Sequence, residues 1–225
     1  IGYPALAAGG GGSVEPRNLV WSTYAGGSSG DEYSCVEVDG AGHPYACGYT
    51  HSNDFPVQPG NEVFSPFIGN FQGWSSAIIS KYSQVNKQLQ WSTFYGGNHS
   101  HEAAGNNQGR TTAQKLCVNA PEVGEGYVFV TGATNTIDFT PYREDESIFQ
   151  EAFIEPNLGG RRRMWVGAFT MYDGRRCWAT THGASGESTW AEDGLAIAMD
   201  PDGTLVVGGR LYNSSTPITD FPSVT

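Results

Sequence analysis

The chain has 225 residues, with 31 Gly, 12 Pro and 12% aromatic residues, a mix typical of short β-strands joined by tight turns. Its net charge of −11 argues against a nucleic-acid partner, because phosphate contacts need clustered Lys and Arg. No apolar run approaches the ~18 residues of a membrane span, so we expect no membrane insertion. No useful helical periodicity stands out either, and we therefore expect an all-β protein.

Two markers alternate along the chain and define a repeating unit. The first is Asp-Phe followed by Pro or Thr, at Asp54-Phe55-Pro56, Asp138-Phe139-Thr140 and Asp220-Phe221-Pro222. The second is a Trp-containing segment that runs into glycine, beginning at Trp21, Trp91 and Trp178. Their fixed alternation predicts successive copies of one structural unit.

The chain opens with a segment that has little apolar surface. We interpret residues 1–18, which include Gly9 to Gly12, as a linker or the cut end of a longer protein, since burial could not offset the entropy of ordering them. Leu19 to Tyr24 is apolar and aromatic and precedes Gly26 and Gly27. This pattern predicts a strand, and residues 19–27 would supply the last strand of one unit.

Residues 28–97 are predicted to form one complete unit of four strands. The expected strands are Tyr33–Asp39, Tyr45–Thr50, Ser75–Tyr82 and Gln88–Tyr95. Gly40-Ala41-Gly42 favours a tight hairpin between the first two, because glycine tolerates the positive φ that such turns need.

Cys35 and Cys47 are equidistant from Ala41, so we expect them to lie adjacent across that hairpin. Neither they nor Cys117 and Cys177 show the spacing of a metal site. Two interpretations remain for the pair. They are either small buried thiols, which is the common state of free cysteine, or a disulfide that would indicate an oxidising compartment.

Residues 98–184 are predicted to form a second four-stranded unit with long insertions, and 185–225 the first half of a third. Four antiparallel strands per repeat is the blade of a β-propeller. The expected total is eleven strands, fewer than three full blades, whereas closed propellers typically need ~4–8 blades. We therefore predict an incomplete ring, closed by missing polypeptide in preference to other copies of the chain. The tryptophans are expected to be packing residues.

The two insertions fall at the same point of successive units, after the second strand, at residues 56–73 and 140–164. Insertions at one point of a repeat emerge on one face, which is usually the face that meets partners. The candidate partner-binding residues are matched aromatics and a basic run, Phe64, Phe67, Phe149, Phe153, Arg161, Arg162 and Arg163. For the arginines a solvated charged loop is the alternative.

The residues of these units resemble a known family, the bacterial seven-bladed β-propeller repeat, often called the SBBP repeat. The resemblance runs from about Leu19 to Pro222 and is carried by Trp91 to Gly97, Val38-Asp39-Gly40, Gly48-Tyr49-Thr50, Asp54-Phe55-Pro56 and Ala77 to Tyr82. The second unit departs from the pattern at Thr140. The resemblance implies a secreted or surface-exposed protein, frequently part of a larger one, with no shared catalytic residues.

No enzymatic signature accompanies these repeats. The sequence has no nucleophile elbow, phosphate-binding loop or dinucleotide fingerprint, and we predict no catalytic, cofactor-binding or metal-binding residues and no cofactor. Asp200-Pro201-Asp202-Gly203 mimics the start of a calcium loop, but the later ligands are missing and it is predicted to be a hairpin turn. His99 and His101 are expected to be loop histidines.

Two functions of different classes follow. The first is a non-enzymatic structural or interaction module of an extracellular or cell-surface assembly, with the periplasm as an alternative location. It would contact protein partners, or the rest of a longer polypeptide, through the insertions. The second is a carbohydrate-binding propeller with pockets lined by aromatics such as Tyr49 and Trp74. Asn98 and Asn213 lie in glycosylation sequons, which matter only in a secreted protein.

Overall fold

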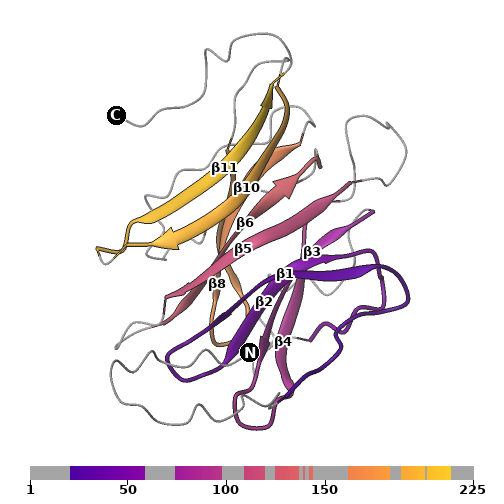
Figure 1. Ribbon diagram of the computed structural model, residues 1–225, viewed down its shortest axis with the longest axis vertical. Coiled ribbons are helices and arrows are strands. Elements are labelled where there is room, and N and C mark those ends of the chain that lie inside the picture. The colour runs from indigo at the N-terminus through magenta and orange to yellow at the C-terminus, as the bar shows by residue number, and fades with distance from the viewer. Residues whose placement is uncertain are drawn as a thin grey trace, which may run out of the picture.

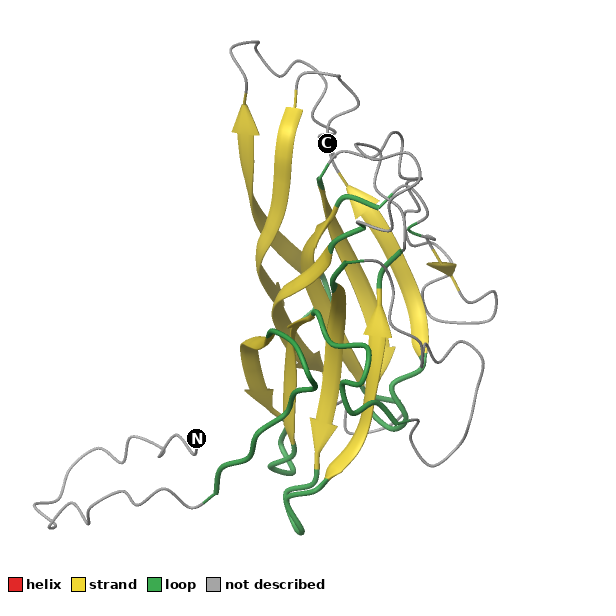
Figure 2. Ribbon diagram, turned by 90° about the vertical axis from the view of Figure 1, so that its right-hand side faces the viewer, coloured by secondary structure: helices red, strands yellow, loops and turns green. Residues whose placement is uncertain are grey.

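The computed structural model describes residues 21–58, 74–97, 109–119, 125–136, 139, 142–143, 162–182, 189–200 and 202–213. These residues form eleven β-strands in three antiparallel sheets and contain no helix (Figures 1 and 2). The all-β prediction is therefore confirmed. The three sheets lie one behind another in chain order, as an open stack that does not close on itself.

The first sheet is a meander of four strands in the order β1-β2-β3-β4. The strands are β1 (Asp31–Val38), β2 (Pro44–Thr50), β3 (Ser76–Tyr82) and β4 (Leu89–Tyr95), each within two residues of its prediction. The β1–β2 turn contains Gly42 at φ +88°, and the carboxylate of Asp39 accepts the backbone N–H groups of Ala41 and His43. The predicted turn chemistry thus holds the hairpin.

The second sheet repeats this order and adds one short strand. It has the order β5-β6-β8-β9-β7, with β5 (Thr111–Asn119), β6 (Tyr127–Thr134), β8 (Arg163–Thr170), β9 (Arg176–His182) and β7 (Tyr142–Arg143). The third sheet is the ribbon of β10 (Thr189–Met199) and β11 (Leu205–Asn213). Its turn repeats the first, because the Asp200 carboxylate accepts backbone N–H groups from Asp202 and Thr204. The predicted hairpin turn is confirmed.

Eleven strands were expected, but one of them differs. The described part of the predicted Leu19–Tyr24 strand, residues 21–24, forms no strand. A strand needs a neighbouring ladder, and no described strand pairs with these residues. Trp21 instead packs the edge of its ring on Tyr82, with centroids 5.9 Å apart. The additional strand is β7, which lies inside the second insertion and pairs with β9.

Consecutive sheets pack face to face around aromatic cores. The core between the first and second sheets contains Trp91 and Tyr95 on one side and Trp165 and Phe169 on the other. Tyr95 lies at the centre, with its ring centroid 5.1 Å from that of Trp165. A smaller core that includes Trp178 joins the second sheet to the third. These tryptophans are packing residues, as predicted.

The Asp-Phe marker has the same structural role in both units where its phenylalanine is described. Phe55 and Phe139 follow the second strand and are both buried. Phe55 packs with Ile78 of β3, and Phe139 packs with Trp165, which occupies the equivalent register position in β8. Each phenylalanine therefore fills the face of its own sheet, which explains why the marker recurs.

The first two strands of every sheet share a β-bulge that faces a glycine. The register shifts in β1, β5 and β10, between Tyr33 and Cys35, Ala113 and Lys115, and Gly194 and Ala196. The facing glycines are Gly48, Gly132 and Gly209. A Cβ added at these glycines would lie 1.8, 1.9 and 2.5 Å from a backbone carbonyl oxygen of the bulged strand. A bulge brings the two backbones close and adds twist, so only glycine fits.

We expect Gly132→Ala to lower the free energy of unfolding by about 1–3 kcal/mol, because the new methyl group would overlap the Thr112 carbonyl oxygen. Gly208→Ala is the matched control. Its Cβ would meet only the Ala196 Cβ at 3.5 Å, and its effect should stay within about 0.5 kcal/mol. Urea unfolding of both variants measures the difference, and equal losses would show that close backbone approach does not select the glycine.

Candidate interaction surface

Both long insertions leave from the same end of the stacked sheets. They connect β2 to β3 and β6 to β8, and backbone hydrogen bonds link the sheets at this end. Ser75 accepts from Thr111 at 2.9 Å, and Asn135 donates to the carbonyl of Arg110 at 3.0 Å while its side chain accepts the Arg110 N–H at 2.7 Å. The strand ends that carry the insertions are therefore fixed relative to each other.

A row of aromatic rings ending in an arginine lies at this end of the sheets. Tyr49 contacts His51 edge to face with centroids 5.6 Å apart, and His51 contacts Trp74 at 5.8 Å. The guanidinium of Arg110 lies 5.7 Å from the Trp74 ring centroid. Trp74 is 50% exposed. We call Tyr49, His51, Trp74 and Arg110 the aromatic row.

Hydrogen bonds hold the aromatic row in place. His51 Nδ1 donates to the carbonyl of Trp74 at 2.9 Å, which ties the end of β2 to the start of β3. The Tyr49 hydroxyl donates to the Glu32 carboxylate at 3.1 Å, and this bond is the main reason that the pKa of Tyr49 is raised. The Tyr49 phenol therefore stays neutral, and the row offers stacking surface with one carboxylate and one guanidinium beside it.

Buried hydroxyl groups support the strand ends beneath the row. In the first sheet Thr50 and Ser52 both donate to the Asp31 carboxylate. The second sheet has a corresponding chain of hydroxyls, from Thr111 to Thr134 at 2.9 Å and on to Thr136 at 2.8 Å. Satisfied networks of this kind fix the backbone around them, which gives the aromatic row a rigid base.

The basic run does not extend freely toward partners. Arg163 is buried, and Arg162 donates through Nε to the carboxylate of Asp193 at 2.5 Å. Arg210 of β11 donates to the other oxygen of the same carboxylate at 3.0 Å. Asp193 is itself buried. Its pair with Arg162 joins the third sheet to the start of β8, and its pair with Arg210 lies within the third sheet. Partner binding by Arg162 or Arg163 therefore stays a prediction that competes with this internal role.

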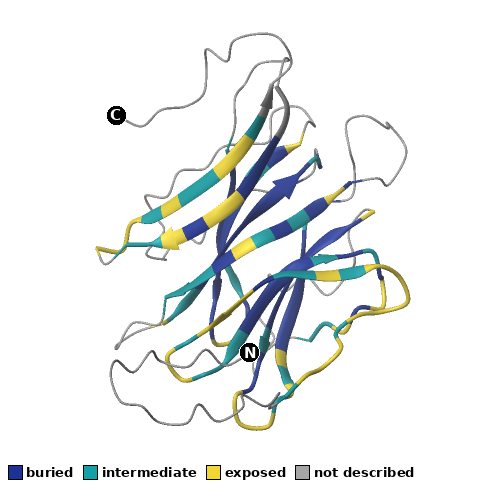
Figure 3. Cartoon of the chain, in the orientation of Figure 1, coloured by how far each residue is buried: buried dark blue, intermediate teal, exposed yellow. Residues whose placement is uncertain are grey.

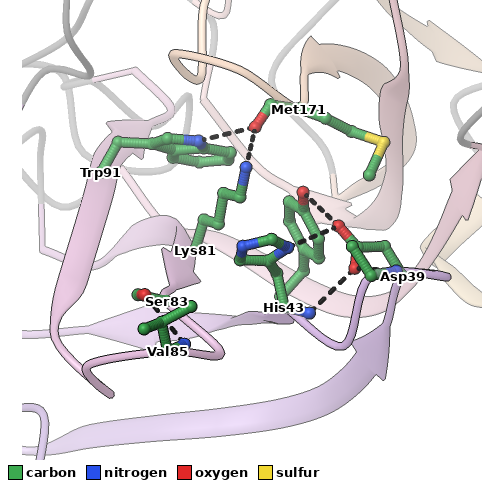
Figure 4. A network of polar contacts seen from close by, with 9 residues as sticks. Asp39, His43, Lys81, Ser83, Val85, Trp91 and Met171 are labelled. Atoms are coloured by element: carbon green, nitrogen blue, oxygen red, sulfur yellow. Dashed lines mark hydrogen bonds and ion pairs between the residues drawn. The ribbon is translucent and has the colours of Figure 1, made fainter.

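The opposite end of the stack has a separate polar network (Figure 4). Lys81 Nζ and the Trp91 indole N–H both donate to the carbonyl of Met171, at 2.9 and 3.1 Å. These bonds cross from the first sheet to the β8–β9 turn of the second. Burial lowers the pKa of Lys81, while nearby Asp39 opposes that shift. Because the Lys81 amine is directed at a backbone carbonyl, its role here is to join two sheets.

The remaining predicted binding residues lie outside the described residues. These are Phe64, Phe67, Phe149, Phe153 and Arg161. The predicted loop histidines His99 and His101, the sequon residue Asn98 and the side chain of the sequon residue Asn213 also lie outside the described residues. Cys35 and Cys47 are direct register partners, so the predicted adjacency is confirmed, and both thiols are free.

The structure brings Tyr49 and Trp74 together, which were named from the sequence as aromatics of a carbohydrate pocket. Sequence reasoning missed His51, which bridges them, and Arg110, which lies on Trp74. The only signal for His51 was its position just after the Gly48-Tyr49-Thr50 strand end. Arg110 reaches Trp74 through pairing between sheets, which no local pattern encodes.

Among the residues that the structure describes, no group of three or more His, Cys, Asp or Glu side chains is placed to hold a metal ion. The same part of the chain contains no helix long and apolar enough to cross a membrane.

We expect Asp193→Ala to destabilise the fold by about 1–2 kcal/mol, since it removes two charged hydrogen bonds whose arginines are only half exposed. The exposed turn residue Asp202 provides the control, and Asp202→Ala should have little effect. Thermal unfolding of the two variants separates the cases. Equal melting temperatures would mean that the ion pairs do not fasten the third sheet.

No family model matches this chain, and no curated protein matches it.

Proposed function

We propose that this chain is a non-enzymatic structural or interaction module of an extracellular or cell-surface assembly, and that its sheets are blades of a β-propeller. The meander order of the first sheet, the repeat of that order in the second and the packing of each sheet on the next support the blade assignment. The resemblance to the SBBP repeat supports the same fold and the location outside the cell. Because one fold can host many functions, the functional proposal depends on the residues exposed on the surface.

The incomplete ring would be completed by the remainder of a longer polypeptide. The β10–β11 ribbon supports this, because its apolar side chains Leu195 and Val206 are exposed. Figure 3 shows exposed stretches on both strands of this ribbon. In the two preceding sheets one face is covered by the next sheet. Another blade packed on this ribbon would bury both side chains and continue the stack.

The aromatic row carries the interaction proposal. Trp, Tyr and Arg are the residue types most enriched among side chains that dominate binding energy at interfaces. Here Trp74, Tyr49 and Arg110 are held by backbone pairing and hydrogen bonds before any partner arrives, which reduces the entropy cost of binding. The row lies at the end from which residues 56–73 and 140–164 leave, so a partner would contact the row and the insertions together.

Trp74→Ala tests this proposal. Once a protein partner has been identified on the immobilised chain, the variant should bind it at least tenfold more weakly, because truncating an interface tryptophan removes a dominant contact. Tyr172→Ala is the control, since Tyr172 is 56% exposed, similar to Trp74, but lies in the turn at the opposite end. Equal affinity of both variants in a calorimetric titration would contradict the assignment of the row.

Carbohydrate binding is the second candidate, and the chemistry of the same row favours it. Trp74 has a half-exposed ring, and the polar groups of Glu32 and Arg110 lie beside the row. Apolar surface with a few convergent polar groups is the usual composition of a small-molecule site. A glycan array decides between the two functions. A bound glycan whose affinity falls in the Trp74→Ala variant indicates a lectin. An array without any bound glycan, together with an identified protein partner, indicates the interaction module.

A further inference from the structure

The first hairpin contains two cysteines that lie directly opposite each other. Cys35 of β1 and Cys47 of β2 are direct register partners, and both thiols are free. Cys47 is fully buried, while Cys35 retains 8% exposure on the edge strand of the sheet. The packing of the hairpin alone does not require two sulfur atoms at these positions, since other small apolar residues would fill the same space.

The position of the pair in the ladder suits a covalent bond. Directly opposed residues of antiparallel strands have Cα atoms about 4.5–5.5 Å apart. Disulfides join Cα atoms about 4.4–6.8 Å apart, so the two ranges overlap almost completely. Cys35 and Cys47 are directly opposed, immediately after the bulge, and no change of strand register is needed to join their sulfurs.

The different environments of the two thiols give them different roles in forming a disulfide. The neighbouring Cys47 thiol lowers the pKa of Cys35 to about 6, with help from the Leu116 backbone and the charge of Lys115 and against the effect of burial. Burial raises the pKa of Cys47. Cys35 is therefore the thiolate that attacks first, and Cys47 is the thiol that resolves the intermediate.

We propose that Cys35 and Cys47 are a reversible cross-strand disulfide pair that is oxidised by a low-molecular-weight disulfide. The Cys35 thiolate attacks one sulfur of that reagent, forms a mixed disulfide and releases one small thiolate. That small thiolate takes the proton of Cys47, and the Cys47 sulfur then attacks the Cys35 sulfur and releases the second small thiolate. The protein dithiol loses two electrons, and the reagent gains them as two thiols.

The other two cysteines provide competitors for this pairing. Cys117 of β5 packs against the core between the second and third sheets. Burial, with a contribution from the charge of Cys35, raises the pKa of Cys117 to about 11, so it remains a thiol at neutral pH. Cys177 is buried in β9 of the second sheet. The geometry therefore predicts one specific bond within the first hairpin, and none to either of these residues.

Mapping the bond in the full chain tests the proposal. The folded, reduced chain is equilibrated with mixtures of oxidised and reduced glutathione, quenched in acid and alkylated. It is then digested with a protease that cleaves after Glu37, which lies between the two cysteines. We expect linked peptides that contain Cys35 and Cys47, with Cys117 and Cys177 alkylated. Addition of excess dithiothreitol should abolish the link.

Cysteine-to-serine variants test which two cysteines form the disulfide. Cys35→Ser and Cys47→Ser should each abolish the linked peptides, whereas Cys177→Ser should retain them in full. Circular dichroism of the oxidised wild-type chain should match the reduced chain, since no strand has to move. The absence of a linked species in the wild type, a bond from Cys35 to Cys117, or a bond that forms only in denaturant would each overturn the proposal.

Discussion

Close contact between a bulged strand and a glycine is the constraint on which the rest of this structure depends. Gly48, Gly132 and Gly209 each sit so near a facing carbonyl that any side chain would overlap it. The bulge bends and twists the first strand of each sheet in the same way. Because all three sheets share this distortion, the face of one can pack on the face of the next, and the aromatic cores form between them.

The stacking in turn positions the surface that we propose to be functional. Pairing of Ser75 with Arg110 and Thr111 fixes the start of the second sheet beside the start of β3. This places a guanidinium from one sheet on an indole from another, an arrangement that neither sheet could make alone. At the opposite end, Lys81 and Trp91 fasten the same two sheets through one carbonyl of Met171. Contacts therefore join the first and second sheets at both ends of the interface between them.

The repeat itself could be predicted from the sequence, because its strands, turns and Asp-Phe marker depend on local residue patterns. The Cys35–Cys47 pairing followed from symmetry about a single turn. Features that depend on distant partners could not be predicted. The segment at Trp21 has strand composition, but no described strand pairs with it. The arginine run was predicted to be a partner-binding or solvated loop, whereas Arg162 pairs with Asp193 of β10. Charge and hydropathy patterns do not predict which repeat units will pack against each other.

Hydrogen exchange of the tryptophan indole N–H groups, followed by NMR, tests the stacked arrangement most directly. The Trp91 indole donates to Met171 of the next sheet, and the Trp165 indole donates to Thr112 within its own. The account predicts that the indole N–H groups of Trp91 and Trp165 exchange slowly, because they exchange only when the whole protein unfolds. The indole N–H of the half-exposed Trp74 should exchange rapidly. Rapid exchange at Trp91 with slow exchange at Trp165 would contradict it, because the individual sheets would then be intact and the packing between them absent.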